Sequence, residues 1–373
     1  SMSKLGFLCS FSKLLIVARV EPISLPNCSI VRFLETLNSF NRSAKVGKKK
    51  KNIKMKKRQE GKMRSNIVES ELSYGYRKLI GNIQFLQYEF RDIPCFEIGS
   101  IGTSTLKKKI PYMQIGKGNR SIFVNAAHHA NEWLTSLVSM MFFEKILNLF
   151  REKRTYKTYE IYELLQNTKL FFVPMVNPDG VDLVVKEPYI FQQKEYLNLI
   201  FKNYGKIKNW KANIRGVDLN LNYPAKWEKA KNAKRKKGIS YPHYRDYVGP
   251  NPLSEVETQN MVSLSNILQF DLSISLHSQG EEIYWDDFQG KIPKSKEIGE
   301  KFAAVSGYTL TKPEIDSSYA GYKDWFVERF QKPGYTIEIG KGNPGEPLPI
   351  SQAGEILEKI EEIFLVALEE IGK

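Results

Sequence analysis

A histidine and a glutamate three positions apart, His129 and Glu132, could bind a metal ion together. They follow an apolar run, 121–127, that is typical of a buried strand, and a long apolar helix pattern, 134–150, comes directly after them. Imidazole nitrogen and carboxylate oxygen both bind zinc, and a catalytic zinc ion has three protein ligands and one position for water. The pair therefore predicts part of a zinc site. The competing interpretation is a buried histidine followed by an acid at the positive end of a helix dipole.

His277 is the third candidate ligand. The chain has only four histidines, and this one follows the apolar strand pattern 270–276 at the start of a polar turn. In an open α/β sheet, ligands bind beyond the carboxyl ends of the strands, so we expect His129 and His277 to meet there. A His, Glu, His ligand set occurs in catalytic zinc peptidases. The sequence thus predicts one zinc ion held by His129, Glu132 and His277, with a capping or core histidine as the alternative for His277.

Glu338 lies inside another apolar strand pattern, 335–339. A buried carboxylate is costly unless it is paired or has a function. A zinc-bound water has a pKa near 7 and still needs a base to take its proton, and burial raises the pKa of a carboxyl group toward the range that such a base requires. We therefore interpret Glu338 as the general base, with an ion pair to a core lysine as the alternative.

The remaining strand and helix patterns alternate along the chain. Strand patterns cover 96–102 and 110–116, a predicted hairpin, and 169–176, which ends in the turn 177–180. Helix patterns cover 69–90, 254–268 with a Ser-x-x-Glu capping box at its start, 292–305 and 352–371. This alternation predicts an α/β fold, a three-layer α/β/α sandwich with a mixed central β-sheet. The irregular stretches 202–247 and 313–322 are expected to build the site.

Five motifs, in this order along the chain, make the sequence resemble the zinc carboxypeptidase family over about residues 72–371. They are His-x-x-Glu-Trp from His129, Asn-Pro-Asp-Gly from Asn177, Gly-Val-Asp-Leu-Asn from Gly216, the pair His277-Ser278 and the late strand acid Glu338. The resemblance implies a zinc-dependent peptidase. It also implies that His129, Glu132 and His277 bind the zinc ion and that Glu338 activates the zinc-bound water.

The resemblance extends to a tyrosine, and the expected reaction needs a cation. Tyr319 resembles the family's mobile-loop tyrosine, which closes over the substrate, and Tyr322 is the alternative. A developing oxyanion needs a fixed positive donor. Arg215 is the expected cation that polarises the scissile carbonyl, Lys211 is the alternative, and an exposed loop cation is the competing interpretation of Arg215.

One position departs from the digestive members of the family. They have Asn-Arg after the Gly-Val-Asp segment, and that arginine clamps the terminal carboxylate of the substrate through two hydrogen bonds. Here the pair is Asn220-Leu221. Leucine cannot bind a carboxylate, which argues against ordinary C-terminal trimming, although Asn220 can still donate a hydrogen bond.

The variant segments 216–227 and 277–285 resemble a bacterial branch, the γ-D-glutamyl-L-diamino acid peptidases. This resemblance implies hydrolysis of the bond between the side-chain carboxyl of D-glutamate and a diamino acid such as meso-diaminopimelate, with peptidoglycan-derived peptides as partners. Lys323, at the family's side-chain pocket, is expected to meet a substrate carboxylate unless it is a surface lysine. Asn220 and Ser278 are the other expected substrate contacts. The alternative is a conventional metallocarboxypeptidase that releases C-terminal amino acids, and a non-catalytic wall-peptide-binding module is disfavoured by the complete set of reactive residues.

The positive charge of the chain is concentrated near its beginning. The net charge is +15, and residues 1–64 contain 16 Lys and Arg but only three acidic residues. The lysine block between 48 and 58 repels itself, so we predict a disordered basic extension, 1–65, followed by a catalytic domain, 66–373. No nucleic acid partner is expected for the catalytic domain, and a nucleic-acid-binding arm is the alternative role of the extension.

The compartment is not decided by the sequence. Three cysteines, two of them in the basic extension, indicate no disulfide framework. No apolar run reaches the ~20 residues of a membrane span, and the run 5–17 is only weakly signal-like because Lys13 interrupts it. A bacterial cytoplasmic location is expected over a secreted one.

Overall fold

An eight-stranded sheet forms the centre of the protein. The computed structural model describes residues 73–285, 292–312 and 319–373, so the predicted extension 1–65 lies outside the described residues. The strand order is β1-β2-β6-β3-β7-β10-β8-β9. Strands β6, β3, β7 and β10 are mutually parallel, as are β8 and β9, whereas the pairs β1–β2, β2–β6 and β10–β8 are antiparallel. The strands are β1 Phe96–Thr103, β2 Lys109–Gly116, β3 Arg120–Ala126, β6 Thr168–Val173, β7 Leu272–His277, β8 Glu282–Tyr284, β9 Thr309–Thr311 and β10 Gly334–Glu338.

The central strands are buried on both faces. Successive side chains of a strand point to opposite sides of the sheet, and in β3 Ile122 and Val124 belong to one apolar core whereas Phe123 belongs to the other. In β7, Ile274 and Leu276 join the first core. Burial on both faces explains why these strands are continuous apolar runs in the sequence.

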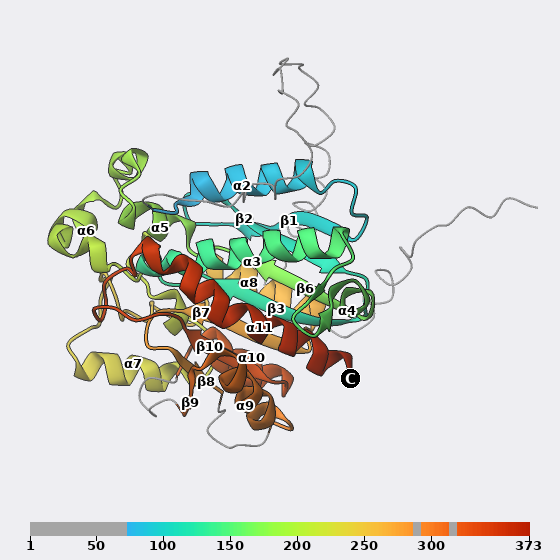
Figure 1. Cartoon of the computed structure of the whole chain (residues 1–373). Helices are drawn as coiled ribbons and strands as arrows, with labels where there is room; N and C mark the ends of the chain where they lie inside the picture. The colour runs from blue at the N-terminus through green and yellow to red at the C-terminus, as the bar shows by residue number, and fades with distance from the viewer. Residues whose placement is uncertain (1–72, 286–291, 313–318) are drawn as a thin grey trace, which may run out of the picture.

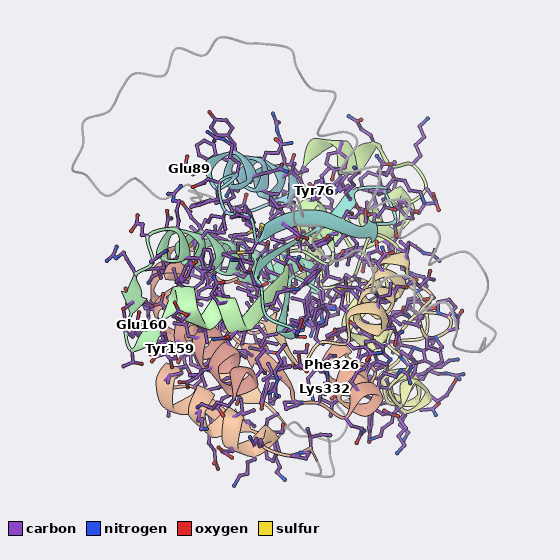
Figure 2. The ribbon with its side chains drawn as sticks, turned by 90° about the vertical axis from the view of Figure 1, so that its right-hand side faces the viewer. Tyr76, Glu89, Tyr159, Glu160, Phe326 and Lys332 are labelled. Atoms are coloured by element: carbon purple, nitrogen blue, oxygen red, sulfur yellow. The ribbon has the colours of Figure 1, made fainter. Side chains whose placement is uncertain are left out.

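Helices cover both faces of the sheet, which gives three layers (Figure 1). On one face, α3 Leu134–Arg151 and α11 Ala353–Gly372 pack against β3. On the other, α8 Val256–Leu268 contacts β1, and α10 Tyr322–Phe330 contacts β7 and β10. The first core also includes α2 Tyr76–Glu89, α4 Ile161–Asn167 and α9 Ser295–Ser306. Figure 2 shows the ends of α2, marked by Tyr76 and Glu89, well apart from Phe326 of α10. The predicted fold class is confirmed.

Shorter elements fill the connections. The long link between β6 and β7 holds α5 Pro178–Val184, η3 Pro188–Gln192, α6 Leu197–Lys202, η4 Tyr204–Asn209, η5 Leu219–Leu221 and α7 Trp227–Lys236. The remaining ones are η2 Ala130–Glu132, η7 Ile350–Gln352 and a small hairpin of β4 Thr155–Tyr156 and β5 Tyr159–Glu160. Helix α7 was not predicted, because half of its ten residues are lysine or arginine and it buries only Trp227 and Ala230.

Two predicted helix starts are corrected by the structure. Helix α2 begins at Tyr76, and residues 73–75 of the predicted helix are not helical, whereas its predicted start, 69–72, lies outside the described residues. The first N–H of α2 donates to Asp182 at 2.8 Å, and the residue before it, Gly75, is extended. Helix α8 begins at Val256 without the predicted capping box. Glu257 accepts instead from the Thr105 N–H at 2.8 Å, because the turn between β1 and β2 reaches the start of this helix.

One helical segment within the described residues, Ala130–Arg151, is long and apolar enough to cross a membrane. However, 83% of its most apolar window is buried inside the protein. It includes α3, which packs against β3, α4 and α11. The segment is therefore a core helix, and its apolar composition reflects its position under the sheet.

Candidate metal centre and active site

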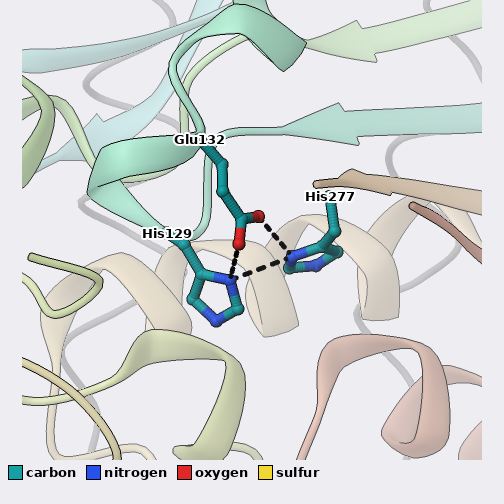
Figure 3. Close-up of side chains that lie close together, drawn as sticks. All are labelled: His129, Glu132 and His277. Atoms are coloured by element: carbon teal, nitrogen blue, oxygen red, sulfur yellow. Dashed lines mark hydrogen bonds and ion pairs between the residues drawn. The ribbon is translucent and has the colours of Figure 1, made fainter. Parts of the chain in front are cut away.

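The three predicted ligands come together beyond the carboxyl ends of β3 and β7 (Figure 3). Glu132 Oε1 lies 2.8 Å from His129 Nδ1, and Glu132 Oε2 lies 3.0 Å from His277 Nδ1. The two histidine Nδ1 atoms are 3.2 Å apart. All three residues are buried. Four potential donor atoms from two places in the sequence, residues 129–132 and residue 277, thus surround one point.

This donor set fits a zinc ion. Two nitrogens bound tetrahedrally to zinc at about 2.05 Å lie about 3.3 Å apart, close to the 3.2 Å between His129 Nδ1 and His277 Nδ1. At most one proton can lie between two imidazole nitrogens that face each other, so a cation satisfies both better. The chemistry of two imidazoles and one carboxylate is that of a catalytic zinc site, which keeps a position for water.

Hydrogen bonds from neighbouring segments fix the turn that presents His129 and Glu132. Two successive N–H groups of η2 donate to the carbonyl oxygens of Trp210 and Lys211, each at 3.0 Å. The Thr135 hydroxyl donates to the Glu132 carbonyl at 2.6 Å. The segment that contains Lys211 therefore supports the backbone of the metal-binding turn, although it lies about 80 residues later in the chain.

Asp218 orients His129, a role that was not predicted from the sequence. Its Oδ1 lies 3.2 Å from His129 Nε2, and the N–H groups of Asn220 and Asp246 donate to the same carboxylate. Burial opposes ionisation of Asp218, but the charge of His129 and their hydrogen bond lower its pKa below the ordinary value. An ionised carboxylate only accepts, so His129 Nε2 carries a proton, and Nδ1 is the nitrogen that would give up its own proton and offer its lone pair to a metal ion. The sequence did contain a signal for this role, because Asp218 is the one charged residue of the Gly-Val-Asp-Leu-Asn motif.

Glu338 lies at the carboxyl end of β10, beside His277 in the register of β7 and β10. Burial, followed by the negative charge of Glu132, raises the pKa of Glu338 to about 8, whereas Lys211 acts in the opposite direction. A divalent cation held by the neighbouring ligands would lower this pKa. The position and the raised pKa are those of a carboxylate that can exchange a proton near neutral pH.

Lys211, rather than Arg215, lies beside the metal-binding side chains. Lys211 Nζ is 3.0 Å from Glu132 Oε1, and its side chain is 18% exposed. Burial opposes the charge of Lys211, but Glu132 and Glu338 raise its pKa and keep it cationic. Arg215 is exposed, and its Nε lies 3.5 Å from Glu255. Within the described residues, the Arg215 side chain forms no hydrogen bond or ion pair with the metal ligands, so the geometry favours Lys211 as the cation.

The two candidate lid tyrosines differ in their surroundings. Tyr319 packs against the cluster that contains Trp227 and Ala320, and its ring centre is 5.6 Å from Lys229 Nζ. Tyr322 is fully buried, and its hydroxyl lies 2.7 Å from the Ser265 hydroxyl. Tyr322 is therefore a core residue of α10, and Tyr319 stays the predicted lid residue.

The three predicted substrate contacts have different neighbours. Asn220 Oδ1 accepts from the first backbone N–H of α10 at 3.0 Å. The Ser278 N–H donates to Glu132 Oε2 at 3.2 Å and so helps to hold a metal ligand. Lys323 is buried, with Nζ 2.6 Å from Asp324 Oδ1. The surface-lysine alternative for Lys323 is thereby excluded, and its contact with substrate stays a prediction.

Comparisons with known proteins agree with this geometry. Residues 84–359 match the family model described as zinc carboxypeptidase, Peptidase_M14. The γ-D-glutamyl-L-diamino acid endopeptidase 1 of Lysinibacillus sphaericus is 37% identical over 81% of this chain and 74% of its own length. Carboxypeptidase B of Astacus astacus is 28% identical over 68% of this chain and 83% of its own length. The fold also matches bovine thrombin-activatable fibrinolysis inhibitor, with a TM-score of 0.62 and 18% identity over 82% of this chain and 99% of that one. The chain therefore belongs to the zinc carboxypeptidase family.

Proposed function

We propose that this protein hydrolyses the bond between the side-chain carboxyl of D-glutamate and a diamino acid in peptides derived from bacterial peptidoglycan. The observation that carries the proposal is the 37% identity, over most of the chain, to an enzyme named γ-D-glutamyl-L-diamino acid endopeptidase. Leu221 supports it: this side chain packs against the apolar cluster around Trp227, so it cannot bind the terminal carboxylate as an arginine would.

In this proposal His129, Glu132 and His277 hold one zinc ion. Zinc, when bound, polarises the amide carbonyl and lowers the pKa of a water molecule to about 7. Glu338 takes the proton of the attacking water and delivers it to the leaving amine. Lys211 places a fixed positive charge beside this centre, where negative charge develops on the carbonyl oxygen.

The remaining predicted residues act on the substrate. Tyr319 closes over it, the Asn220 amide contacts it, and Lys323 attracts one of its carboxylates. Ser278 contributes through its backbone, because its N–H holds the Glu132 carboxylate in place. The proposed catalytic domain is 66–373, and the basic extension has no part in the chemistry.

The test uses purified protein with and without a zinc chelator. L-Ala-γ-D-Glu-meso-diaminopimelate and a blocked dipeptide with a free C-terminal carboxylate are offered separately, and products are followed by mass. We expect chelator-sensitive release of diaminopimelate from the first substrate only. Cleavage of the dipeptide alone would identify a conventional metallocarboxypeptidase, and cleavage of neither would support a binding module.

A further inference from the structure

Glu282, a residue without an assigned role so far, lies at the strand position that pairs with Glu338, which in turn pairs with His277. In the sheet, Glu338 of β10 pairs with His277 of β7 on one side and with Glu282 of β8 on the other. Side chains at paired positions lie on the same face, and adjacent strands are about 4.8 Å apart. Glu282 is therefore one strand from the proposed base and about 10 Å from a proposed metal ligand. The negative charge of Glu282 also adds, as a minor cause, to the raised pKa of Glu338.

The Glu282 carboxylate has no basic partner among residues 73–285, 292–312 and 319–373. Its Oε2 accepts from the Tyr284 hydroxyl, and no lysine or arginine of those ranges forms an ion pair with it. The preceding residue is a contrast: Glu281 pairs with Lys341 at 2.8 Å and with Lys359 at 2.6 Å. A half-buried carboxylate beside a reaction centre, with only a hydroxyl on it, can accept a cation from the substrate.

A polar strip leads away from the reacting bond along this face. The strip consists of two residue pairs of β10 and β8. Glu338 pairs with Glu282, and Thr336 pairs with Tyr284 two residues farther along the strands. Such a step measures about 6.7 Å, which is close to the length of a five-carbon side chain. The strip is thus long enough for the side chain of a diamino acid whose backbone amine is the leaving group.

Side chains of α10 close the far end of the strip. A Cβ atom on Gly334, two residues beyond Thr336 on the same face of β10, would lie 2.7 Å from Val327 Cγ2, 3.4 Å from Phe326 Cδ1 and 3.6 Å from Lys323 Cγ. The Tyr284 hydroxyl donates to the Glu282 carboxylate, so this carboxylate reaches along the strip toward residue 284. Diaminopimelate carries an amine at the distal end of its side chain, and the negative charge of Glu282 matches that amine.

We propose that Glu282 binds the distal ammonium group of the diamino acid and so selects diamino acids over amino acids with an uncharged or acidic side chain. This inference rests on the proposed function, and it names the charge that the site recognises. Glu282 acts on substrate affinity, because the distal amine is not part of the bond that breaks.

The test compares two substrates in steady-state kinetics with the full-length zinc-loaded protein. One is L-Ala-γ-D-Glu-meso-diaminopimelate, and the other carries L-2-aminopimelate, which lacks only the distal amine. For Glu282→Gln we expect KM for the first substrate to rise about tenfold, the value of one good ion pair, with kcat within twofold. KM for the second substrate should not change. Glu282→Asp, which keeps the charge, should retain part of the preference.

Glu281→Gln is the matched control, since it makes the same chemical change one residue earlier at a carboxylate already paired with two lysines. It should leave the ratio of the two substrates unchanged. An equal loss on both substrates in Glu282→Gln would overturn the inference, because it would show an effect on Glu338 or on folding. An unchanged ratio would also overturn it. If the wild-type protein cleaves neither substrate, the proposed function fails and this inference fails with it.

Discussion

Two groups of buried charged side chains among the described residues differ in whether the protein itself provides a partner for each charge. One, the Lys108 network, consists of Lys108, Asp179 and Asp182. The other, the metal group, consists of His129, Glu132 and His277. Both contain residues far apart in the sequence, and both are largely shielded from water. Burial of charge alone does not distinguish them.

The Lys108 network is closed. Lys108 Nζ lies 3.1 Å from Asp179 and 2.6 Å from Asp182. The other oxygen of each carboxylate accepts a backbone N–H at 2.8 Å, from Leu106 and from Tyr76 respectively. Each carboxylate oxygen thus has a partner within the protein, and the network holds the β1–β2 turn, α2 and α5 together. Its role is structural.

The metal group is open. Its acceptors face one another, with His129 Nδ1 and His277 Nδ1 3.2 Å apart and both next to the same carboxylate. Lys211 contacts only one oxygen of Glu132. Electron-rich atoms that converge on one point need a cation from outside the chain. The difference between the two groups shows that the site of chemistry is marked by several metal-binding atoms that face one point without a partner for each, and not by burial.

The largest effect is expected at the open group. Glu338→Gln removes the proposed base but no metal ligand, so kcat for the wall-peptide substrate should fall about 10³-fold, or about 4 kcal/mol in activation free energy. Zinc content, measured by atomic absorption, should stay at one ion per chain. A kcat within tenfold of the wild-type value would contradict the assignment of Glu338.

The closed network predicts a loss of stability instead. Lys108→Met leaves two buried carboxylates without their cation, which should lower the free energy of unfolding by about 3 kcal/mol. The measurement is denaturant unfolding followed by fluorescence. At a temperature where the variant is folded, kcat should remain within about twofold of wild type. A variant that is fully stable but inactive would reverse the distinction between the two groups.

A smaller effect is expected for the residue that orients a ligand. Asp218→Asn keeps the shape of the side chain but removes the charge that holds the proton on His129 Nε2. Zinc affinity, measured by competition with a chelator of known affinity, should fall about 10- to 100-fold. Equal zinc affinity in both proteins would show that the ring of His129 is positioned without Asp218.

The smallest effect is expected in the pH dependence of stability that Glu257, a neighbour of the Lys108 network, causes. Burial raises the pKa of Glu257 from 4.5 to about 7, with Asp179 adding to the rise while the hydrogen bond from Thr105 opposes it. A raised carboxyl pKa favours the protonated form, so this stabilisation is full below about pH 4.5 and is lost as the pH rises through 7. Glu257→Gln stays neutral, so at pH 8 it should be more stable than wild type by about 1 to 2 kcal/mol. Thermal unfolding at pH 5 and pH 8 measures this, and an equal difference at both pH values would refute the ionisation of Glu257 as the cause.

Much of the fold was predictable because local patterns and burial agree in it. Strands buried on both faces, such as 121–127 and 270–276, are continuous apolar runs, and the structure confirms them as β3 and β7. The amphipathic C-terminal helix is confirmed as α11. The capping box at Ser254 was wrong because a residue from a distant turn, Thr105, competes for Glu257. A local rule fails where a long-range hydrogen bond is stronger.

The sequence alone determined which side chains could bind a metal ion. The scarcity of histidine, the spacing of His129 and Glu132 and the strand that ends at His277 suffice for this, because ligand chemistry depends on residue type and on position at a strand end. Only the tertiary structure decided which other charges reach the site. Lys211 and Arg215 are four residues apart in one irregular segment, yet one contacts Glu132 and the other Glu255. The same holds for Glu282, whose place beside Glu338 comes from strand pairing. Irregular segments have no period that reveals where a side chain points, so the packing of distant elements determines it.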